Sequence, residues 1–225
     1  MNNITDFTKA LQEVAPEINI LKNENLSKHT VSGTGGTVAV FAQPKTEDEL
    51  RILLGLCEKY RITPSILGAG SKIIGSEDAL DSIVVCTRGS LGGVERDGVR
   101  GLRVGAGVSL KYLSFFACAA GLSGLEFACA LSGTVGAASK YNPRIGASCI
   151  GDVQRKTRVV DYQGQAWLYE EDEQRFGDNR SAFSDGYSIV TQVQYFLTPD
   201  DPARIRAKMV EIRNRVRTAT AIATV

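Results

Sequence analysis

The sequence predicts an α+β protein with two lobes. Two observations support that fold class. Helix-spaced apolar residues and short strand-like runs occur together along the 225 residues, and turn signals join several of the strand-like runs into hairpins. We place the division between the lobes near residues 88 to 92. The expected parts are residues 1–90, residues 91–200, and a C-terminal helix and tail over residues 201–225.

Helix and strand signals alternate in the first part. Ile4, Phe7 and Leu11 have the spacing of one helix face. The run T-E-D-E at residues 46–49 is a capping-box pattern and predicts the start of a second helix. The apolar face of that helix is formed by Leu50, Leu53, Leu54 and Cys57. Strands are expected at residues 64–67 and 82–86.

Hairpins around one helix are predicted for the second part. Residues 94–104 form a hairpin with Asp97 and Gly98 in its turn. Ser109 is the expected N-cap of a helix that Gly121 ends. Strands follow at residues 158–162, 165–169 and 188–197, the first two as another hairpin.

A final helix begins at Pro202, because proline is favoured in the first turn. Its apolar stripe suits packing better than membrane binding. The stripe consists of Ile205, Met209, Ile212 and Val216. The basic residues around it form a solvated face or a surface that docks a partner subunit, and residues 218–225 show no clear element.

Charge and composition exclude several classes of function. The 26 basic and 25 acidic residues give a net charge of +1, which offers no electrostatic footprint for nucleic acid or an anionic membrane. No apolar run approaches the ~20 residues that span a bilayer, and the N-terminus has no secretory pattern. Five isolated cysteines and one histidine argue against a metal site. We expect a cytoplasmic protein with reduced thiols.

Three glycine-rich turns are candidates for binding phosphate. They occupy residues 67–71, 104–108 and 132–136, and successive backbone N–H groups in such turns can form a concave anion site. Ser71 adds a hydroxyl and Lys72 a counter-charge. The first turn lacks the third glycine of G-x-G-x-x-G, so each turn alone is a weak signal. Together they favour a ligand of dinucleotide size.

Residues 121–138, G-L-S-G-L-E-F-A-C-A-L-S-G-T-V-G-A-A, are the most informative stretch of the chain. Four glycines lie there among small and apolar residues. Glycine has no Cβ and tolerates positive φ, so the pattern indicates tight turns or a flat ligand against the main chain.

These motifs, taken in order, resemble the UDP-N-acetylenolpyruvoylglucosamine reductase family over nearly the whole chain. The segment S-G-T-V-G-A-A at 132–138 is similar to the family's P-G-T-V-G-G-A. Further along the chain, residues 176–183 resemble its F-G-Y-R-x-S-x-F. The preceding motifs are N-L-S-K-H-T at 25–30, P-K-T-E-D-E-L at 44–50, L-G-A-G-S at 67–71, V-G-A-G-V-S-L at 104–110 and G-L-S-G-L-E-F-A at 121–128.

The resemblance implies a two-lobed FAD-binding domain of the PCMH type, similar to vanillyl-alcohol oxidase, with tightly held FAD. It also implies that Arg180 is the catalytic candidate, because Arg180 matches the arginine that contacts the family's enolpyruvyl group. The cofactor-binding residues that it implies are Gly68, Ala69, Gly70, Ser71, Lys72, Gly124, Glu126, Gly133, Thr134, Gly136, Ala137, Asn142, Ile150 and Val190.

Some positions depart from the family pattern. Lys72 replaces an asparagine, Ala137 replaces a glycine, and Pro143 and Asn179 stand where the family has other residues. No S-A-G-S-x-F-K segment follows Arg217. We therefore expect the UDP-sugar domain, with its serine proton donor, to be missing, which leaves no obvious general acid for the enol carbon.

Alternatives stay open for several side chains. His29 either links covalently to the flavin or, preferably, forms a hydrogen bond in its loop. Cys129 either faces the isoalloxazine or fills space as a small buried residue. Glu126 is either a base or an acceptor for backbone N–H groups. The same choice between ligand contact and an ordinary packing or surface role applies to Tyr141, Arg144 and Tyr187.

Two functions of different classes follow. The first is an FAD-dependent oxidoreductase that acts on a small molecule other than the family's sugar nucleotide. An anionic substrate and NADPH as electron donor are open possibilities. The second is a non-catalytic FAD-binding scaffold or partner subunit. A homodimer is compatible with either, and we expect neither nucleic acid nor a membrane as partner.

Overall fold

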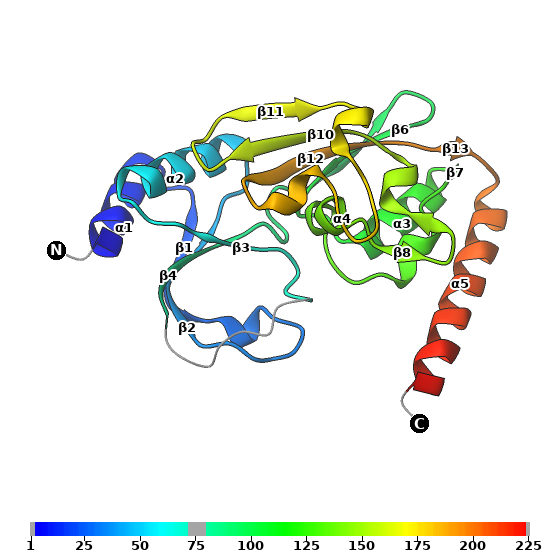
Figure 1. The fold of residues 1–225 in the computed structure, drawn as a ribbon, viewed down its shortest axis with the longest axis horizontal. Coiled ribbons are helices and arrows are strands. Elements are labelled where there is room, and N and C mark those ends of the chain that lie inside the picture. The colour runs from blue at the N-terminus through cyan, green and yellow to red at the C-terminus, as the bar shows by residue number, and fades with distance from the viewer. Residues whose placement is uncertain (1–2, 72–79, 224–225) are drawn as a thin grey trace.

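The computed structural model describes residues 3–71 and 80–223, which form two main β-sheets with helices packed on them. Figure 1 shows α1 and α2 beside the first sheet at one end, and α3, α4 and α5 at the other. This arrangement confirms the predicted α+β class. The expected division near residues 88 to 92 falls on the connection between the sheets, and the bounds of the lobes stay a prediction.

The first sheet has the strand order β1-β2-β4-β3. Its strands are β1 (Asn19–Asn25), β2 (Thr37–Gln43), β3 (Ser65–Leu67) and β4 (Leu80–Cys86). β1 is antiparallel to β2, whereas β4 is parallel to both of its neighbours. The helices α1 (Asn3–Val14) and α2 (Glu47–Lys59) confirm the two predicted apolar faces. Their side chains share one core, which includes Phe7, Leu11, Val40, Leu50, Leu53, Leu54, Cys57 and Ile83.

The second sheet is antiparallel throughout and has the order β11-β10-β12-β6-β5. Its strands are β5 (Val94–Asp97), β6 (Gly101–Gly105), β10 (Gln154–Asp161), β11 (Ala166–Tyr169) and β12 (Ser188–Phe196). Both predicted hairpins are confirmed. The helices α3 (Leu110–Ala119) and α4 (Val135–Tyr141) pack into the same core as this sheet.

Short elements connect these parts. The short strands are β7 (Leu122–Ser123), β8 (Arg144–Ile145), β9 (Ser148–Cys149) and β13 (Thr198–Pro199). The 3₁₀ turns are η1 (Leu26–Lys28), η2 (Glu126–Ala130), η3 (Ile150–Asp152), η4 (Glu171–Gln174) and η5 (Ala182–Asp185).

The two predicted helix N-caps, Thr46 and Ser109, both form, but the carboxylate of the predicted capping box at Thr46 has a different hydrogen-bond partner. Thr46 Oγ1 accepts the Glu49 N–H at 3.1 Å, and Ser109 Oγ accepts the Tyr112 N–H at 3.1 Å. The Glu49 carboxylate accepts the N–H of Lys45 at 2.6 Å rather than that of Thr46. Both caps satisfy backbone donors that have no partner inside the helix.

The two sheets are joined by packing and by an ion pair. Val160 of β10 and Ile189 of β12 are buried in the core of the first sheet. On the surface above them, Glu47 of α2 accepts hydrogen bonds from Arg158 Nε at 2.7 Å and from Thr191 Oγ1 at 2.7 Å. The first lobe is thus held to β10 and β12 of the second by both apolar and charged contacts.

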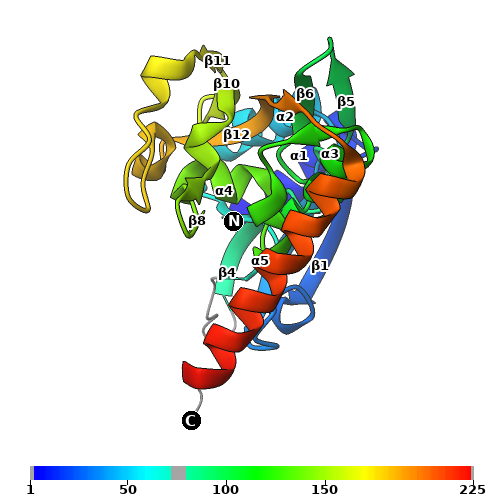
Figure 2. The ribbon, with the colours of Figure 1, turned by 90° about the vertical axis from the view of Figure 1, so that its right-hand side faces the viewer.

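The last helix, α5 (Pro202–Ala223), begins where predicted but continues further. The expectation of no element after residue 218 is wrong for residues 218–223, because helix spacing continues into the alanine-rich segment. Ile205 and Met209 of the predicted stripe are buried against Cys118 and Cys129, which confirms packing at that end. Figure 2 shows the remainder of α5 extending past the body of the protein.

Other sequence-based expectations concern cysteines and membranes. All five cysteines are free and buried. Among the described residues, no helix is long and apolar enough to cross a membrane. The strands β1 and β2 lie outside the predicted elements. For β1, the polar composition of residues 19–25 gives no clear alternation.

Candidate functional site

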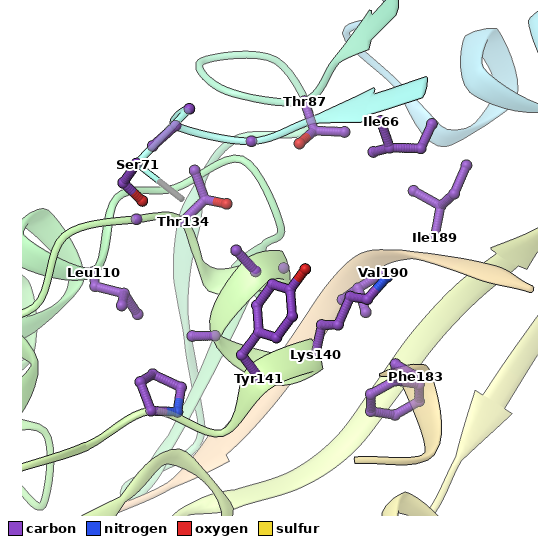
Figure 3. A pocket seen from close by; sticks show the side chains of 18 of the residues that line it. Ile66, Ser71, Thr87, Leu110, Thr134, Lys140, Tyr141, Phe183, Ile189 and Val190 are labelled. Atoms are coloured by element: carbon purple, nitrogen blue, oxygen red, sulfur yellow. The ribbon is translucent and has the colours of Figure 1, made fainter. Parts of the chain in front are cut away.

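A cavity of about 290 Å³ opens between the end of β3, the start of α4 and the near face of β12 (Figure 3). Its lining is mostly backbone, small side chains and apolar groups. The lining residues are Ile66, Gly68, Ala69, Gly70, Ser71, Thr87, Leu110, Ser132, Gly133, Thr134, Gly136, Ala137, Ala138, Lys140, Tyr141, Pro143, Tyr162, Phe183, Gly186, Ser188, Ile189 and Val190.

One wall is the turn after β3, residues 68–71. Gly70 has φ +63°, and a Cβ there would lie 2.3 Å from the carbonyl oxygen of His29. Its own carbonyl oxygen accepts the N–H of Val31 at 3.1 Å. No backbone–backbone hydrogen bond among the described residues uses the N–H groups of residues 69–71. The turn therefore keeps several donors available to a ligand.

The facing wall is the start of α4. Gly133 has φ +122°, and Gly136 donates its N–H to the Ala106 carbonyl oxygen at 2.9 Å. The turns also contact each other closely, because a Cβ on Gly68 would lie 2.9 Å from Thr134 Oγ1. A larger residue at position 68 would push the two walls apart.

The hydroxyl of Thr134 is the clearest sign that the cavity binds a polar ligand. Thr134 is 1% exposed, lines the cavity and has no hydrogen-bond partner among the described residues. A buried hydroxyl without a partner is unfavourable, so native proteins nearly always satisfy it. Together with the unused N–H groups of residues 69–71, it fits an elongated ligand that carries phosphate oxygens.

Beside the predicted Val190, the part of the cavity lined by β12 and α4 contains two residues that the sequence argument missed, Ile189 and Lys140. Ile189 and Val190 of β12 lie across from Phe183, and Lys140 extends along the wall beside Val190 (Figure 3). Lys140 and Tyr141 lie three to five residues after Gly136 and Ala137. Helical spacing along α4 would have placed all four on one face.

Nine of the predicted residues meet at this cavity. They are Gly68, Ala69, Gly70, Ser71, Gly133, Thr134, Gly136, Ala137 and Val190. Lys72 lies outside the described residues. Gly124, Glu126, Asn142, Ile150 and Arg180 lie elsewhere.

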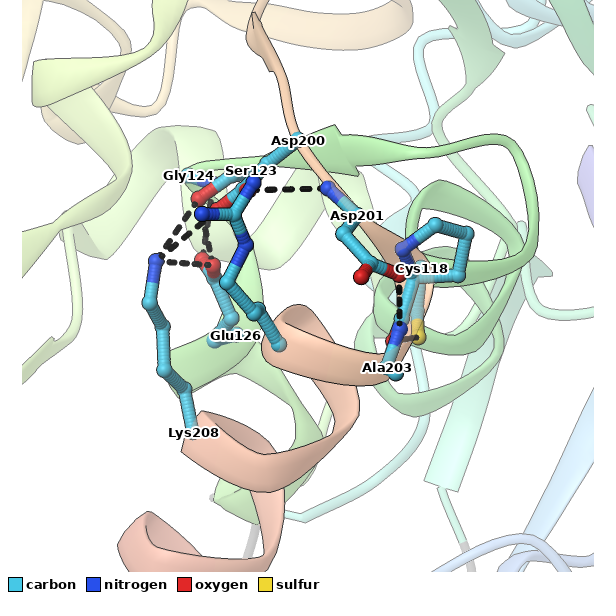
Figure 4. Close-up of polar contacts among 10 residues, drawn as sticks. Cys118, Ser123, Gly124, Glu126, Asp200, Asp201, Ala203 and Lys208 are labelled. Atoms are coloured by element: carbon cyan, nitrogen blue, oxygen red, sulfur yellow. Dashed lines mark hydrogen bonds and ion pairs between the residues drawn. The ribbon is translucent and has the colours of Figure 1, made fainter.

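Gly124 and Glu126 form a separate polar cluster where α5 docks on the second lobe (Figure 4). The buried Glu126 carboxylate accepts the Ser123 hydroxyl at 2.6 Å and the Gly124 N–H at 2.7 Å. Lys208 of α5 lies 3.7 Å from the same carboxylate and 3.3 Å from Asp200. These contacts favour the acceptor alternative for Glu126 and leave its carboxylate satisfied within the protein.

Asn142, Ile150 and Arg180 also lie away from the cavity lining. Asn142 ends α4 with φ +42°, donates to the Gly177 carbonyl oxygen at 2.9 Å and accepts the Gly151 N–H at 2.8 Å. Ile150 is fully buried in the core of the second lobe. Arg180 is exposed in the loop that follows β11. Their predicted roles remain predictions.

His29, the candidate for covalent flavin attachment, and Cys129, the candidate for facing the isoalloxazine, both have partners within the protein. The His29 ring stacks on Phe41 with centroids 4.1 Å apart, and its Nε2 lies 3.0 Å from Glu24. Cys129 Sγ donates to the Met209 carbonyl oxygen at 3.6 Å. Burial raises the pKa of the Cys129 thiol, which disfavours the reactive thiolate.

The third predicted turn, residues 104–108, contributes none of the described lining residues, but it packs against Thr87, which does line the cavity. A Cβ on Gly105 would lie 2.1 Å from the Leu91 carbonyl oxygen, and one on Gly107 would lie 2.0 Å from the Thr87 carbonyl oxygen. These glycines allow β6 and the connection between the lobes to pack backbone against backbone.

A wider groove of about 720 Å³ continues from the cavity toward α5. Ala69, Ser132 and Gly133 line both spaces. Its apolar part is formed by Val31, Cys129, Ala130, Leu131, Val210 and Val216. Its charged part is formed by Arg88, Lys111, Arg213 and Arg217, and no acidic side chain is among its described lining residues.

Comparison with known proteins agrees with this architecture. The family described as an FAD binding domain matches residues 38–167. The UDP-N-acetylenolpyruvoylglucosamine reductase of Geobacillus kaustophilus is 30% identical over 212 residues, which cover 94% of this chain and 69% of that protein. The corresponding enzyme of Shouchella clausii is 31% identical over 94% of this chain and 68% of that protein.

Solved structures agree as well. The UDP-N-acetylenolpyruvylglucosamine reductase of Thermus caldophilus superposes with a TM-score of 0.72 and 26% identity, over 89% of this chain and 69% of that one. An alkyldihydroxyacetonephosphate synthase superposes with a TM-score of 0.65 at 15% identity, over 87% of this chain and 40% of that one, and shows the shared fold.

The chain is therefore a flavoprotein domain with the two-lobed, PCMH-type FAD-binding fold, and its cofactor is FAD. Within that class, it belongs to the UDP-N-acetylenolpyruvoylglucosamine reductase family of oxidoreductases. Both expectations from the sequence are confirmed.

Proposed function

We propose that the protein is an FAD-dependent oxidoreductase whose substrate is a small anion other than a sugar nucleotide, with NADPH as electron donor. The observation that supports this proposal is the groove beside the cofactor cavity. Arg88, Lys111, Arg213 and Arg217 line it, and none of them forms an ion pair with a described carboxylate.

The groove has the chemistry that an anionic substrate needs. Arginine donates to carboxylate or phosphate oxygens through two parallel N–H groups, and the surrounding apolar residues strengthen those contacts by excluding water. Because Ala69 and Gly133 line both spaces, a molecule in the groove would lie next to one in the cavity. Bound FAD supplies hydride chemistry, while the arginines bind and orient the substrate.

A different substrate from that of the named relatives is supported by departures within the motifs. Ala137 lines the cavity where the family pattern has glycine, and Pro143 lines it where that pattern has another residue. Arg180, the match to the family's substrate-contacting arginine, is exposed and outside both linings.

The experiment starts with the visible absorption spectrum of the purified protein and continues with anaerobic addition of NADPH. We expect bound flavin that NADPH bleaches. Calorimetric titration of the holoprotein with pyrophosphate and with oxalate then tests the groove. The double variant Arg213→Ala/Arg217→Ala should weaken anion binding about tenfold or more, and Arg180→Ala should not. Flavin that no donor reduces would overturn the oxidoreductase proposal.

The second candidate is a non-catalytic scaffold that pairs with another subunit or a second copy. It is favoured by the exposed apolar surface of α5, where Val210 is 52% exposed. Light scattering of the holoprotein distinguishes the candidates when combined with the reduction assay, because a scaffold would form a complex and show no reduction.

A further inference from the structure

We propose that Lys140 is a cofactor-binding residue whose ammonium group neutralises phosphate charge on the bound dinucleotide. Nothing in the motif comparison assigned this lysine a role. The proposal concerns the cofactor alone, and it goes beyond the proposed function.

Lys140 lies on the face of α4 that lines the cavity. Gly136 and Ala137 precede it on the same face by one helical turn, and all three are lining residues. The Cα–Cβ bond of a helical residue tilts toward the helix N-terminus, so rotamers of Lys140 that continue this tilt run toward Gly133 and Thr134 at the start of α4. Figure 3 shows the side chain extending along the cavity wall beside Val190.

The backbone at Lys140 is held in place from the neighbouring loop. Its carbonyl oxygen accepts the Ser181 hydroxyl at 3.0 Å and the Ser184 hydroxyl at 2.7 Å. These bonds attach the end of α4 to η5, which carries Phe183 of the same cavity. The stem of Lys140 is therefore positioned by the fold, and only its side-chain rotamers remain to be selected by a ligand.

Lys140 carries the only charged side chain among the described residues that line the cavity. No described carboxylate pairs with it, and its ammonium lies 5.8 Å from the centroid of the Tyr141 ring. The other described lining residues contribute neutral N–H groups, hydroxyls and apolar surface. A dinucleotide brings a doubly charged diphosphate into this space, and Lys140 is the described lining residue whose side chain carries the opposite charge.

The test is a flavin titration of apoprotein, followed by fluorescence quenching, with FAD and riboflavin as the two probes. Riboflavin lacks phosphate and reports contacts to the ring system. In Lys140→Met, FAD affinity should fall about tenfold or more, while riboflavin affinity stays within about twofold. Lys140→Arg keeps the charge and should retain most of the FAD affinity. Added salt should narrow the difference between wild type and Lys140→Met.

Lys22→Met is the matched control, because Lys22 is exposed on β1 and its replacement removes the same charge far from the cavity. Thermal unfolding of each apoprotein checks folding, and Lys140→Gln replaces Lys140→Met if the latter is unfolded. Equal FAD affinity in wild type and Lys140→Met would overturn the proposal. An equal loss for FAD and riboflavin would also overturn it, because that outcome indicates a structural role. No electron donor or substrate is present, so the result is independent of whether the proposed function fails.

Discussion

The two halves of the glycine-rich stretch from residue 121 to residue 138 have different uses. Residues 132–134 and 136–138 line the cofactor cavity, whereas residues 121–128 contact α5 and the segment that leads into it. A Cβ on Gly124 would lie 3.1 Å from side-chain atoms of both Leu197 and Val153, while one on Gly133 would meet only Ser71 Oγ at 3.6 Å. The first glycine makes room for protein, and the second leaves room for a ligand.

A glycine-rich pattern therefore indicates that other atoms lie close to the backbone. It does not indicate whether those atoms belong to the protein or to a ligand. The two possibilities differ in whether buried polar groups nearby have hydrogen-bond partners within the protein. Glu126, in the first half, is 8% exposed and has its carboxylate satisfied by Ser123, Gly124 and Lys208. Thr134, in the second half, has a buried hydroxyl without a described partner. An unsatisfied buried group is therefore the better marker of the ligand site.

The comparison between the two halves can be tested by substitution, and the largest change in stability is expected at Glu126. Glu126→Ala leaves the buried N–H of Gly124 without its acceptor and Lys208 without one carboxylate, so we expect the free energy of unfolding to fall by about 3 kcal/mol. FAD affinity should change by less than about twofold, because Glu126 lies outside the cavity lining. Urea denaturation and flavin titration measure the two effects, with the exposed Glu171→Ala as control. A large loss of FAD affinity in the folded variant would contradict the assignment.

A smaller loss of stability is expected when the ion pair between Glu47 and Arg158, which supports the β12 wall of the cavity, is removed. Burial would raise the pKa of Glu47, but hydrogen bonds from Arg158 and Thr191 and the charges of Arg158 and Arg51 outweigh it, so the pKa is lowered from its ordinary value of 4.5. Thr191 adjoins Val190 of the cavity, which ties the ion pair to this wall. At neutral pH we expect Glu47→Gln to destabilise the protein by about 1 kcal/mol.

The pH dependence follows from the sign of that shift. A carboxyl with a lowered pKa contributes stability above its unfolded pKa, and this contribution is lost as the pH falls through the folded value. The difference in unfolding free energy between wild type and Glu47→Gln should therefore shrink below pH 4.5. Urea denaturation from pH 7 to pH 3 measures it, and a constant difference across that range would contradict the assigned cause.

The smallest changes are expected at Thr134, where a substitution should preserve or raise the stability of the apoprotein but lower its affinity for FAD. Thr134→Val removes the unsatisfied hydroxyl, so the apoprotein should be as stable as wild type or more stable by up to about 1 kcal/mol. FAD affinity should fall about fivefold, because the hydroxyl loses its ligand partner. Thermal unfolding and flavin titration measure the pair, and Thr198→Val, at an exposed threonine of β13 outside both linings, serves as control. Unchanged FAD affinity would show that the ligand does not reach Thr134.

Local signals predicted most of the fold. The caps at Thr46 and Ser109, the hairpin turn at Asp97 and the start of α5 at Pro202 each depend on neighbouring residues, and each is present in the structure. β1 lacks such a signal because all of its residues are exposed or half-buried, so they show no alternation of apolar and polar side chains. It is stabilised by its long-range pairing with β2, which no local pattern reveals.

The site was less predictable than the fold, because its lining also depends on contacts between residues far apart in the sequence. Motif matching found both cavity-lining turns, because the glycines of each turn lie within four consecutive residues. It also selected Gly124, which packs against Leu197, and it passed over Lys140. Which residues face the cavity depends on how α4 meets β12, and these two elements are separated by more than forty residues.

The position of β12 within the second sheet has a consequence for synthesis of the protein. β12 pairs with β10 on one side and β6 on the other, and its residues Ile189 and Val190 line the cavity. Since a chain leaves the ribosome from its N-terminus, the first sheet can assemble while the second still lacks a central strand. The wall against which FAD binds is completed only after β12 has emerged, so the cofactor site forms after both sheets have received their strands.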